Sequence, residues 1–149
     1  IIWRGPMIHN AINQMLQTTD WGDLDYLLID LPPGTSDAPL TIMQVLTMDG
    51  FIVVTTPQEL AKVDAKRSIN MVRKLQVNVL GVVENMSGGV FGSGAGKEIA
   101  EELDLDFLGA IGLRSEYQDT SKPTSLLSND VLNEYRIISE NALSVLATI

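Results

Sequence analysis

Short apolar runs alternate along the chain with stretches whose apolar residues recur every three or four positions. Continuous runs such as Ile52-Val53-Val54 predict strands of a parallel sheet, which are covered on both faces. The three-to-four spacing predicts amphipathic helices. The expected strands span 26–31, 50–55, 78–86 and 107–113, and the expected helices span 5–19, 40–46, 94–103, 129–147 and a stretch beginning at Thr56. This alternation predicts an α/β fold, a parallel sheet with flanking helices and right-handed crossovers.

The expected start of one helix is a specific motif. Thr56-Pro57-Gln58-Glu59 matches a capping box with proline at the first helical position. We therefore expect Thr56 to cap this helix and Glu59 to reach back toward it.

Composition and charge limit the classes of protein to which this chain can belong. The chain has 149 residues, 45% hydrophobic and 19% charged, and no linker, so we expect a single domain over 1–149. A net charge of −9 with only 10 basic residues argues against a nucleic-acid partner. No cysteine is present, and no apolar run approaches the ~18 residues of a membrane span. We expect a cytoplasmic protein without a membrane partner. Because the chain starts at Ile1 rather than Met, we expect it to be part of a longer protein.

Asp30 is the first candidate for chemistry. It ends the apolar run Tyr26-Leu27-Leu28-Ile29 and precedes Leu31-Pro32-Pro33-Gly34-Thr35. A carboxylate at a strand end lies where α/β sheets bind ligands, and it could order Mg²⁺ through water. Capping of the following turn is the structural alternative. The two prolines stiffen the loop and Gly34 permits close backbone approach, which favours a sensor of a nucleotide phosphate.

Two further segments end or follow apolar runs. Gly92-Ser93-Gly94-Ala95-Gly96-Lys97 is not a phosphate-binding P-loop, because Phe91 stands where the first glycine belongs and Glu98 where Ser or Thr belongs. A glycine-rich helix start is the better interpretation. Asn85 follows Glu84 at the end of another apolar run, and its amide could read a purine edge or form a turn.

Several short blocks occur in order over nearly the whole chain, and together they are diagnostic. They are Trp3-Arg4-Gly5-Pro6-Met7, Trp21-Gly22-Asp23-Leu24-Asp25, Asp30-Leu31-Pro32-Pro33-Gly34-Thr35, Leu40-Thr41-Ile42, Thr56-Pro57-Gln58-Glu59, Ile69-Asn70-Met71 and Leu80-Gly81-Val82-Val83-Glu84-Asn85-Met86-Ser87. In these blocks the chain resembles the Mrp/ApbC type of P-loop ATPase, which belongs to the MinD-like deviant Walker ATPases and includes carriers and scaffolds for iron–sulfur cluster assembly.

The resemblance implies a P-loop NTPase fold of the MinD kind, incomplete at its N-terminus, and an ATP/ADP site with Mg²⁺. Asp30 would belong to the Mg²⁺ site and act in hydrolysis with Gly34, while Pro32, Pro33 and Thr35 would form the switch beside the γ-phosphate. Asn85 would contact adenine. Ile111 and Leu113 would lie along the base, although Gly112 between them stands where the family usually has proline.

Two departures from the family limit what these residues can do alone. The resemblance places the P-loop upstream of Ile1, so the 149 residues by themselves should not bind or hydrolyse ATP well. The family also carries a Cys-x-x-Cys pair after the Glu-Asn-Met-Ser block, where two subunits bridge a cluster, and here Ser87 leads directly to a helix. Residues 1–149 would then be the C-terminal portion of an ATPase domain.

Three functions remain open from the sequence. The first is a homodimeric ATP-binding carrier or scaffold for iron–sulfur clusters, holding a 4Fe–4S cluster in the intact protein and serving iron–sulfur client proteins. The second is a MinD/ParA-like ATPase switch without a metal cluster, which the missing cysteines favour. The third is a non-catalytic interaction domain of the same fold.

Overall fold

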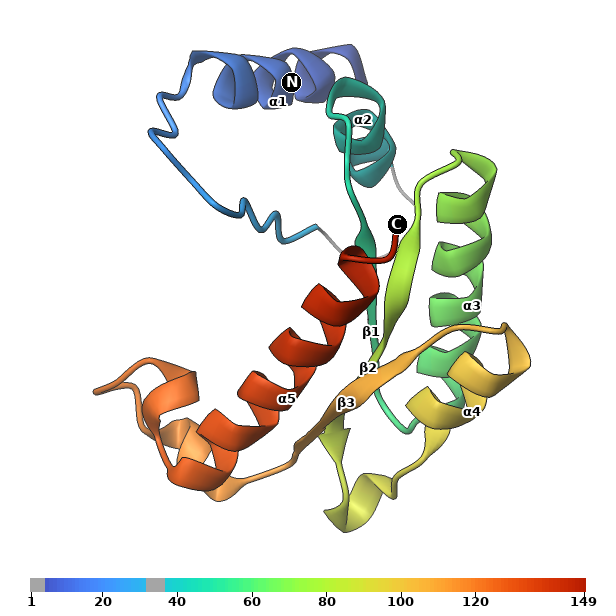
Figure 1. The fold of residues 1–149 in the computed structure, drawn as a ribbon, viewed down its shortest axis with the longest axis vertical. Coiled ribbons are helices and arrows are strands. Elements are labelled where there is room, and N and C mark those ends of the chain that lie inside the picture. Colours follow the sequence, from blue (N-terminus) through green and yellow to red (C-terminus); the bar gives the residue numbers. More distant parts are fainter. Residues whose placement is uncertain (1–4, 32–36) are drawn as a thin grey trace. The chain divides into compact units, whose positions relative to one another are not determined.

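The computed structural model describes residues 5–31 and 37–149, which fall into two compact units, Ile1–Met48 and Asp49–Ile149 (Figure 1). The first unit contains two helices that contact each other, α1 (Gly5–Thr18) and α2 (Asp37–Val45). Both helices were expected from the apolar spacing, and α2 begins three residues earlier than predicted.

The strand predicted at 26–31 does not form. These residues form no regular secondary structure and belong to no sheet, and Tyr26, Leu27 and Leu28 are 61%, 43% and 88% exposed. A parallel strand depends on a neighbouring strand for its ladder of hydrogen bonds, and no part of the described chain pairs with this run. The prediction is therefore wrong in this structure.

The second unit is built on a parallel sheet in the order β1-β2-β3. Its strands are β1 (Phe51–Thr55), β2 (Val79–Ser87) and β3 (Phe107–Gly112), and its helices are α3 (Glu59–Lys74), α4 (Ala95–Glu102) and α5 (Asn129–Leu146). Single 3-10 turns, η1 (Gly89–Phe91), η2 (Ser115–Gln118) and η3 (Thr124–Leu126), occupy the connections. The parallel α/β architecture predicted from the sequence is confirmed, and apart from the start of α3 the element ends of this unit differ from the predicted ones by at most one residue.

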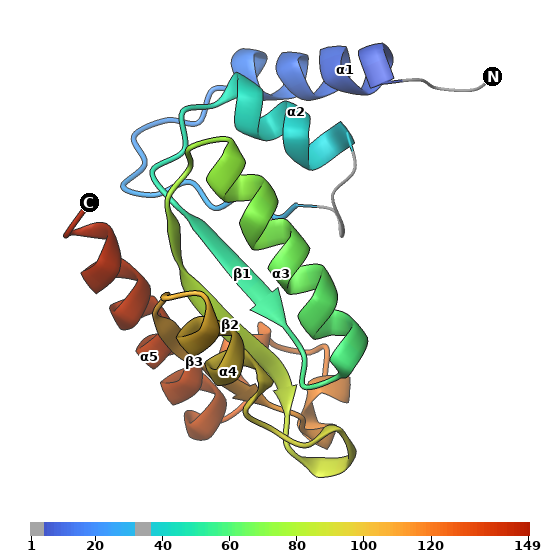
Figure 2. The same ribbon diagram turned by 90° about the vertical axis from the view of Figure 1, so that its right-hand side faces the viewer.

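Helices cover both faces of this sheet (Figure 2). On one face, α3 and α4 pack through Ile69 and Ile99 against Val82 of the central strand. On the other face, α5 packs through Ala142 against Val83. Adjacent residues of β2 thus point into opposite cores, which is why its sequence is a continuous apolar run. The sheet positions its strand ends rigidly because both faces are covered.

The start of α3 differs from the predicted capping box. The helix begins at Glu59, and the cap position is held by Gln58, whose side chain makes no capping hydrogen bond. The Glu59 carboxylate accepts a hydrogen bond from Lys62 Nζ at 3.2 Å instead of reaching back to Thr56. Thr56 Oγ1 is buried and has no partner among the described residues. The motif therefore marks the region of the helix start, but its reciprocal bonds are not made.

The start of α5 follows the expected chemistry. Ser128 Oγ accepts a hydrogen bond from the Val131 backbone N–H at 3.4 Å, and Asn141 Nδ2 donates to the Leu108 carbonyl oxygen at 2.8 Å. The Asn141 side-chain amide thereby fastens α5 to β3.

Within 5–31 and 37–149, no helix is both long enough and apolar enough to cross a membrane.

Candidate functional site

The predicted site residues are divided between the two units. Asp30 lies in the first unit, with an exposed side chain that makes no hydrogen bond or ion pair to residues 5–31 or 37–149. The predicted switch residues Pro32, Pro33, Gly34 and Thr35 lie outside the described residues. The other candidates, Asn85, Ile111 and Leu113, belong to the second unit.

The second unit brings Asn85 and Leu113 to the same edge of the sheet. Asn85 lies near the carboxyl end of β2, and Leu113 directly follows β3. The Leu113 backbone N–H donates to the Ser87 carbonyl oxygen at 2.9 Å, which holds the two strand ends together. Because both strands run in the same direction, this edge is the one at which α/β proteins bind ligands.

The side chains at this edge divide into a core group and an exposed group. Ile111 is partly buried and packs against the cluster of Val83, Leu108 and Ala142 beneath α5. Leu113 is 42% exposed and so presents apolar surface at the edge. The structure therefore offers Leu113, more than Ile111, as an apolar contact for a ligand.

Asn85 presents its amide at an irregularity in β2, where the pairing with β3 shifts register between Glu84 and Ser87. Its Oδ1 accepts a hydrogen bond from the Met86 backbone N–H at 2.8 Å, and Met86 adopts a left-handed backbone with φ of 57°. Within the described part of the chain, no hydrogen bond uses Asn85 Nδ2. An amide nitrogen with both protons available can donate to a ring nitrogen or a carbonyl oxygen of a ligand.

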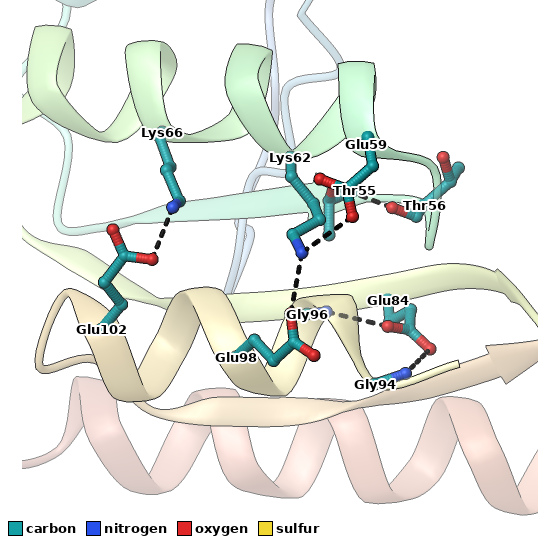
Figure 3. A network of polar contacts seen from close by, with 10 residues as sticks. All are labelled: Thr55, Thr56, Glu59, Lys62, Lys66, Glu84, Gly94, Gly96, Glu98 and Glu102. Carbon is teal, nitrogen blue, oxygen red and sulfur yellow. Dashed lines mark hydrogen bonds and ion pairs between the residues drawn. The ribbon is translucent and has the colours of Figure 1, made fainter. Parts of the chain in front are cut away.

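Glu84 is a buried acid at this edge that the sequence did not single out. The residue is 1% exposed, and its carboxylate accepts hydrogen bonds from the Gly96 N–H at 2.8 Å and the Gly94 N–H at 3.1 Å (Figure 3). It also accepts a hydrogen bond from Ser87 Oγ at 2.7 Å. Burial alone would raise the pKa of Glu84, but these hydrogen bonds outweigh it and the pKa is lowered. Glu84 is therefore an internal anion bound at the start of α4.

This carboxylate explains why the glycine-rich stretch is not a phosphate loop. Gly94 caps α4 in the left-handed conformation, with φ of 100°, and its N–H and that of Gly96 point to Glu84. These N–H groups are the ones that a helix start would otherwise offer to a phosphate. The interpretation as a glycine-rich helix start is confirmed, and the anion is supplied by the chain itself.

A second acid, Glu134, fixes the end of β3. Arg114 binds it through two hydrogen bonds, Nη1 to Oε2 at 2.7 Å and Nη2 to Oε1 at 2.6 Å, and Gly112 N–H donates to Oε2 at 3.3 Å. The hydrogen bonds from the Arg114 guanidinium lower the pKa of Glu134. Burial acts in the opposite direction, but its effect is smaller, so the pKa is lowered overall. No local sequence motif marks this pair, because its members are 20 residues apart.

The residues able to bind a metal are sparse. Within the described ranges, no group of three or more His, Cys, Asp or Glu side chains could hold a metal ion. Asp30 offers one exposed carboxylate. This fits Mg²⁺, which takes one or two protein carboxylates and completes its shell with water and substrate phosphates.

The chain is similar to proteins that are named for iron–sulfur cluster transfer and for nucleotide binding. Residues 1–143 match the family model described as NUBPL iron-transfer P-loop NTPase. The iron–sulfur cluster carrier protein of Methanocaldococcus jannaschii is 44% identical over 152 aligned residues, covering 93% of this chain and 52% of that protein. The chain thus spans about half the length of this relative.

Two solved structures are similar to the chain over most of its length. The nucleotide-binding protein from Archaeoglobus fulgidus, in complex with ADP, matches 92% of this chain and 54% of that chain with a TM-score of 0.65 and 34% identity. The cell division ATPase MinD of Pyrococcus furiosus matches 95% of this chain and 59% of that chain with a TM-score of 0.67. At 18% identity, the second match supports the fold alone.

Proposed function

Because the chain belongs to the NUBPL iron-transfer P-loop NTPase family, we propose that it forms part of the ATP site of an iron–sulfur cluster carrier. The observation that carries this proposal is the edge at which β2 and β3 end. There the Leu113–Ser87 hydrogen bond of 2.9 Å brings an available amide, Asn85, close to an exposed apolar side chain. A purine base needs both kinds of contact, polar at its edge and apolar at its face.

We propose a separate task in nucleotide binding for each predicted residue. Asn85 donates from Nδ2 to the edge of adenine, and Leu113 covers a face of the base, with Ile111 supporting it from the core. Asp30 accepts hydrogen bonds from the water shell of Mg²⁺. Gly34 acts with Asp30 in hydrolysis, and Pro32, Pro33 and Thr35 shape the switch beside the γ-phosphate. The role of Mg²⁺, when bound, is to neutralise charge on the phosphates.

The test of nucleotide binding is calorimetry on the full-length protein. Mg–ATP should bind, and Asn85→Ala should weaken that binding by about tenfold, the size of one lost polar contact to a base. Asn70→Ala is the matched control, because Asn70 is an exposed asparagine on α3. Absence of Mg²⁺-dependent ATP binding in the unmodified protein would refute the proposal.

Cluster transfer forms the second half of the proposal, with the cluster as cargo. The 149 residues contain no cysteine, and the chain passes from Ser87 through η1 to α4 without a thiolate. This favours, as a second candidate, a MinD-like ATPase switch that carries no cluster. A homodimer, iron–sulfur client proteins and a cytoplasmic location remain predictions, as does the assignment of 1–149 to one domain.

Anaerobic reconstitution separates the two candidates. The full-length protein is incubated with iron, sulfide and a thiol reductant, desalted, and its iron content and visible absorption are measured. A carrier should retain iron with the broad absorption of a 4Fe–4S cluster and lose it to an apo-ferredoxin. A protein that binds Mg–ATP but retains no iron would be the switch instead.

A further inference from the structure

We propose that Glu134 and Arg114 are positioning residues that hold the end of β3 in place for recognition of the nucleotide base. This inference rests on the proposed ATP site and adds to it the residues that set its selectivity. Neither side chain reaches the base itself in this account. They act through Gly112 and Leu113.

The pair holds the strand end through the backbone as well as through charge. The Gly112 N–H donates to Glu134 Oε2 at 3.3 Å, and Arg114 Nη1 donates to the Gly112 carbonyl oxygen at 3.4 Å and to the Tyr117 hydroxyl at 3.2 Å. Both polar groups of Gly112 are thus engaged by a bidentate ion pair whose side chains are only 26% and 22% exposed. A planar, two-bond pair of this kind fixes orientation, which a single contact does not.

The position of the guanidinium depends on the small size of Gly112. A Cβ atom added at Gly112 would lie 2.9 Å from Arg114 Nη1 and 3.2 Å from Arg114 Cζ. The guanidinium therefore lies directly against the strand end, and α5, which carries Glu134, is fastened there. The next residue along the chain is Leu113, the exposed apolar candidate for the base.

The same contacts continue to the other base-reading residue. Leu113 N–H donates to the Ser87 carbonyl oxygen at 2.9 Å, and Ser87 Oγ donates to Glu84 Oε1 at 2.7 Å. Asn85 lies between Glu84 and Ser87 in the chain. Hydrogen bonds thus connect Glu134 on α5, through Gly112 and Leu113, to Ser87 and Glu84 on β2. Leu113 makes one of these bonds, and Asn85 is covalently flanked by the β2 segment that they hold. Loosening Glu134 should shift Leu113 relative to Asn85.

An ion pair that only stabilises the fold makes a different prediction from one that positions the site. Loss of a purely structural pair lowers the free energy of unfolding and leaves nucleotide selectivity as it was. Loss of positioning changes the ratio of affinities for ATP and GTP, because the two bases differ in their edge donors and acceptors. The ratio is therefore the informative quantity.

The experiment uses the full-length protein and calorimetric titration with Mg–ATP and Mg–GTP. The unmodified protein should prefer ATP, and Glu134→Gln and Arg114→Lys should each reduce the ATP-to-GTP affinity ratio by about fivefold, mainly by weakening ATP. Arg114→Lys keeps a cation beside Glu134 but removes the planar fork. Glu102→Gln is the matched control, since Glu102 pairs with Lys66 and carries no link to Gly112.

The outcomes are distinguishable. A ratio unchanged within twofold in Arg114→Lys, with lowered thermal stability, would make the pair structural only and overturn this inference while leaving the ATP site intact. An unmodified protein that binds neither nucleotide would overturn the proposed function. Should Glu134→Gln fail to fold, Arg114→Lys decides the matter alone, because it retains the charge on both sides of the pair.

Discussion

Glu84 and Asp30 have the same sequence context and opposite environments. Each acid ends an apolar run, Val79–Val83 in one case and Tyr26–Ile29 in the other. Glu84 is 1% exposed, and its oxygens accept hydrogen bonds from two backbone N–H groups and a serine. Asp30 is exposed and has no such partner among residues 5–31 and 37–149. One carboxylate is occupied within the structure, whereas the other is available to a ligand.

The comparison shows what distinguishes an acid that is bound within the structure from one that is exposed. The apolar run before the acid is the same in both, so it cannot discriminate. The donors come from elsewhere: Gly94 and Gly96 follow Glu84 by 10 and 12 residues and open a helix at its carboxylate. Because these donors hold the Glu84 carboxylate, we interpret Glu84 as structural, and the role of Asp30 in chemistry remains a prediction.

The largest expected effect is the loss of stability in Glu84→Ala. This change leaves the buried N–H groups of Gly94 and Gly96 without an acceptor, and the free energy of unfolding should fall by about 3 kcal/mol. Urea unfolding of the full-length protein measures it. The control is Glu102→Ala, because Glu102 is an exposed acid on α4. This substitution should change the free energy of unfolding by no more than about 0.5 kcal/mol. Equal losses of unfolding free energy in Glu84→Ala and Glu102→Ala would contradict the description of Glu84 as a buried acid that the fold depends on.

A smaller loss should follow from crowding the same contact. In Gly96→Ala the added Cβ would lie 2.9 Å from Glu84 Cβ and 3.1 Å from Phe107 Cε2, so a packed strand or helix must shift. We expect a loss of about 1–2 kcal/mol in the free energy of unfolding. Lys97→Ala, at the next, exposed position of α4, serves as the control. Wild-type stability in Gly96→Ala would mean that α4 is not held against Glu84 as closely as described.

The pH dependence of the free energy of unfolding should also show that Glu84 is bound within the fold, with a smaller effect than the two substitutions above. The hydrogen bonds to Glu84 overcome burial and lower its pKa from the ordinary 4.5. Its ionised form therefore contributes stability above about pH 4.5, and this contribution is lost as the pH falls through the lowered pKa. Urea unfolding between pH 6 and pH 3 should show a shallower decline in Glu84→Gln than in wild type. Parallel curves would argue that Glu84 titrates alike in the folded and unfolded chains.

Much of the second unit could be predicted because its signals are local. The three strands, the three long helices and the parallel arrangement follow from apolar runs and three-to-four spacing. The failures involve partners distant in sequence. The apolar run at 26–31 would need a neighbouring strand in order to form a strand itself. In the predicted capping box, Glu59 pairs with Lys62 instead of bonding back to Thr56, and Lys62 also pairs with Glu98 on α4.

The candidate site also contains residues that local sequence signals predict and residues that only contacts distant in sequence bring together. Asn85 is predicted from the end of an expected strand and from the family resemblance, and Leu113 is predicted from the resemblance alone. The structure brings the two strand ends together. Glu84 could have been noticed as an acid before a glycine-rich helix start, which is a common arrangement for anion binding. Arg114 and Glu134 could not, because only the packing of α5 against β3 brings them into contact.

The most direct test of the contrast between the two acids is the Mg²⁺-dependent ATP hydrolysis rate of full-length Asp30→Asn. The carboxylate is proposed to hold the metal's water shell, so the rate should fall by roughly 100-fold, a few kcal/mol of transition-state stabilisation. Its thermal unfolding should match that of the unmodified protein, because no described residue depends on Asp30. A rate within twofold of wild type, in a protein that hydrolyses ATP, would contradict the assignment of Asp30 to the chemistry.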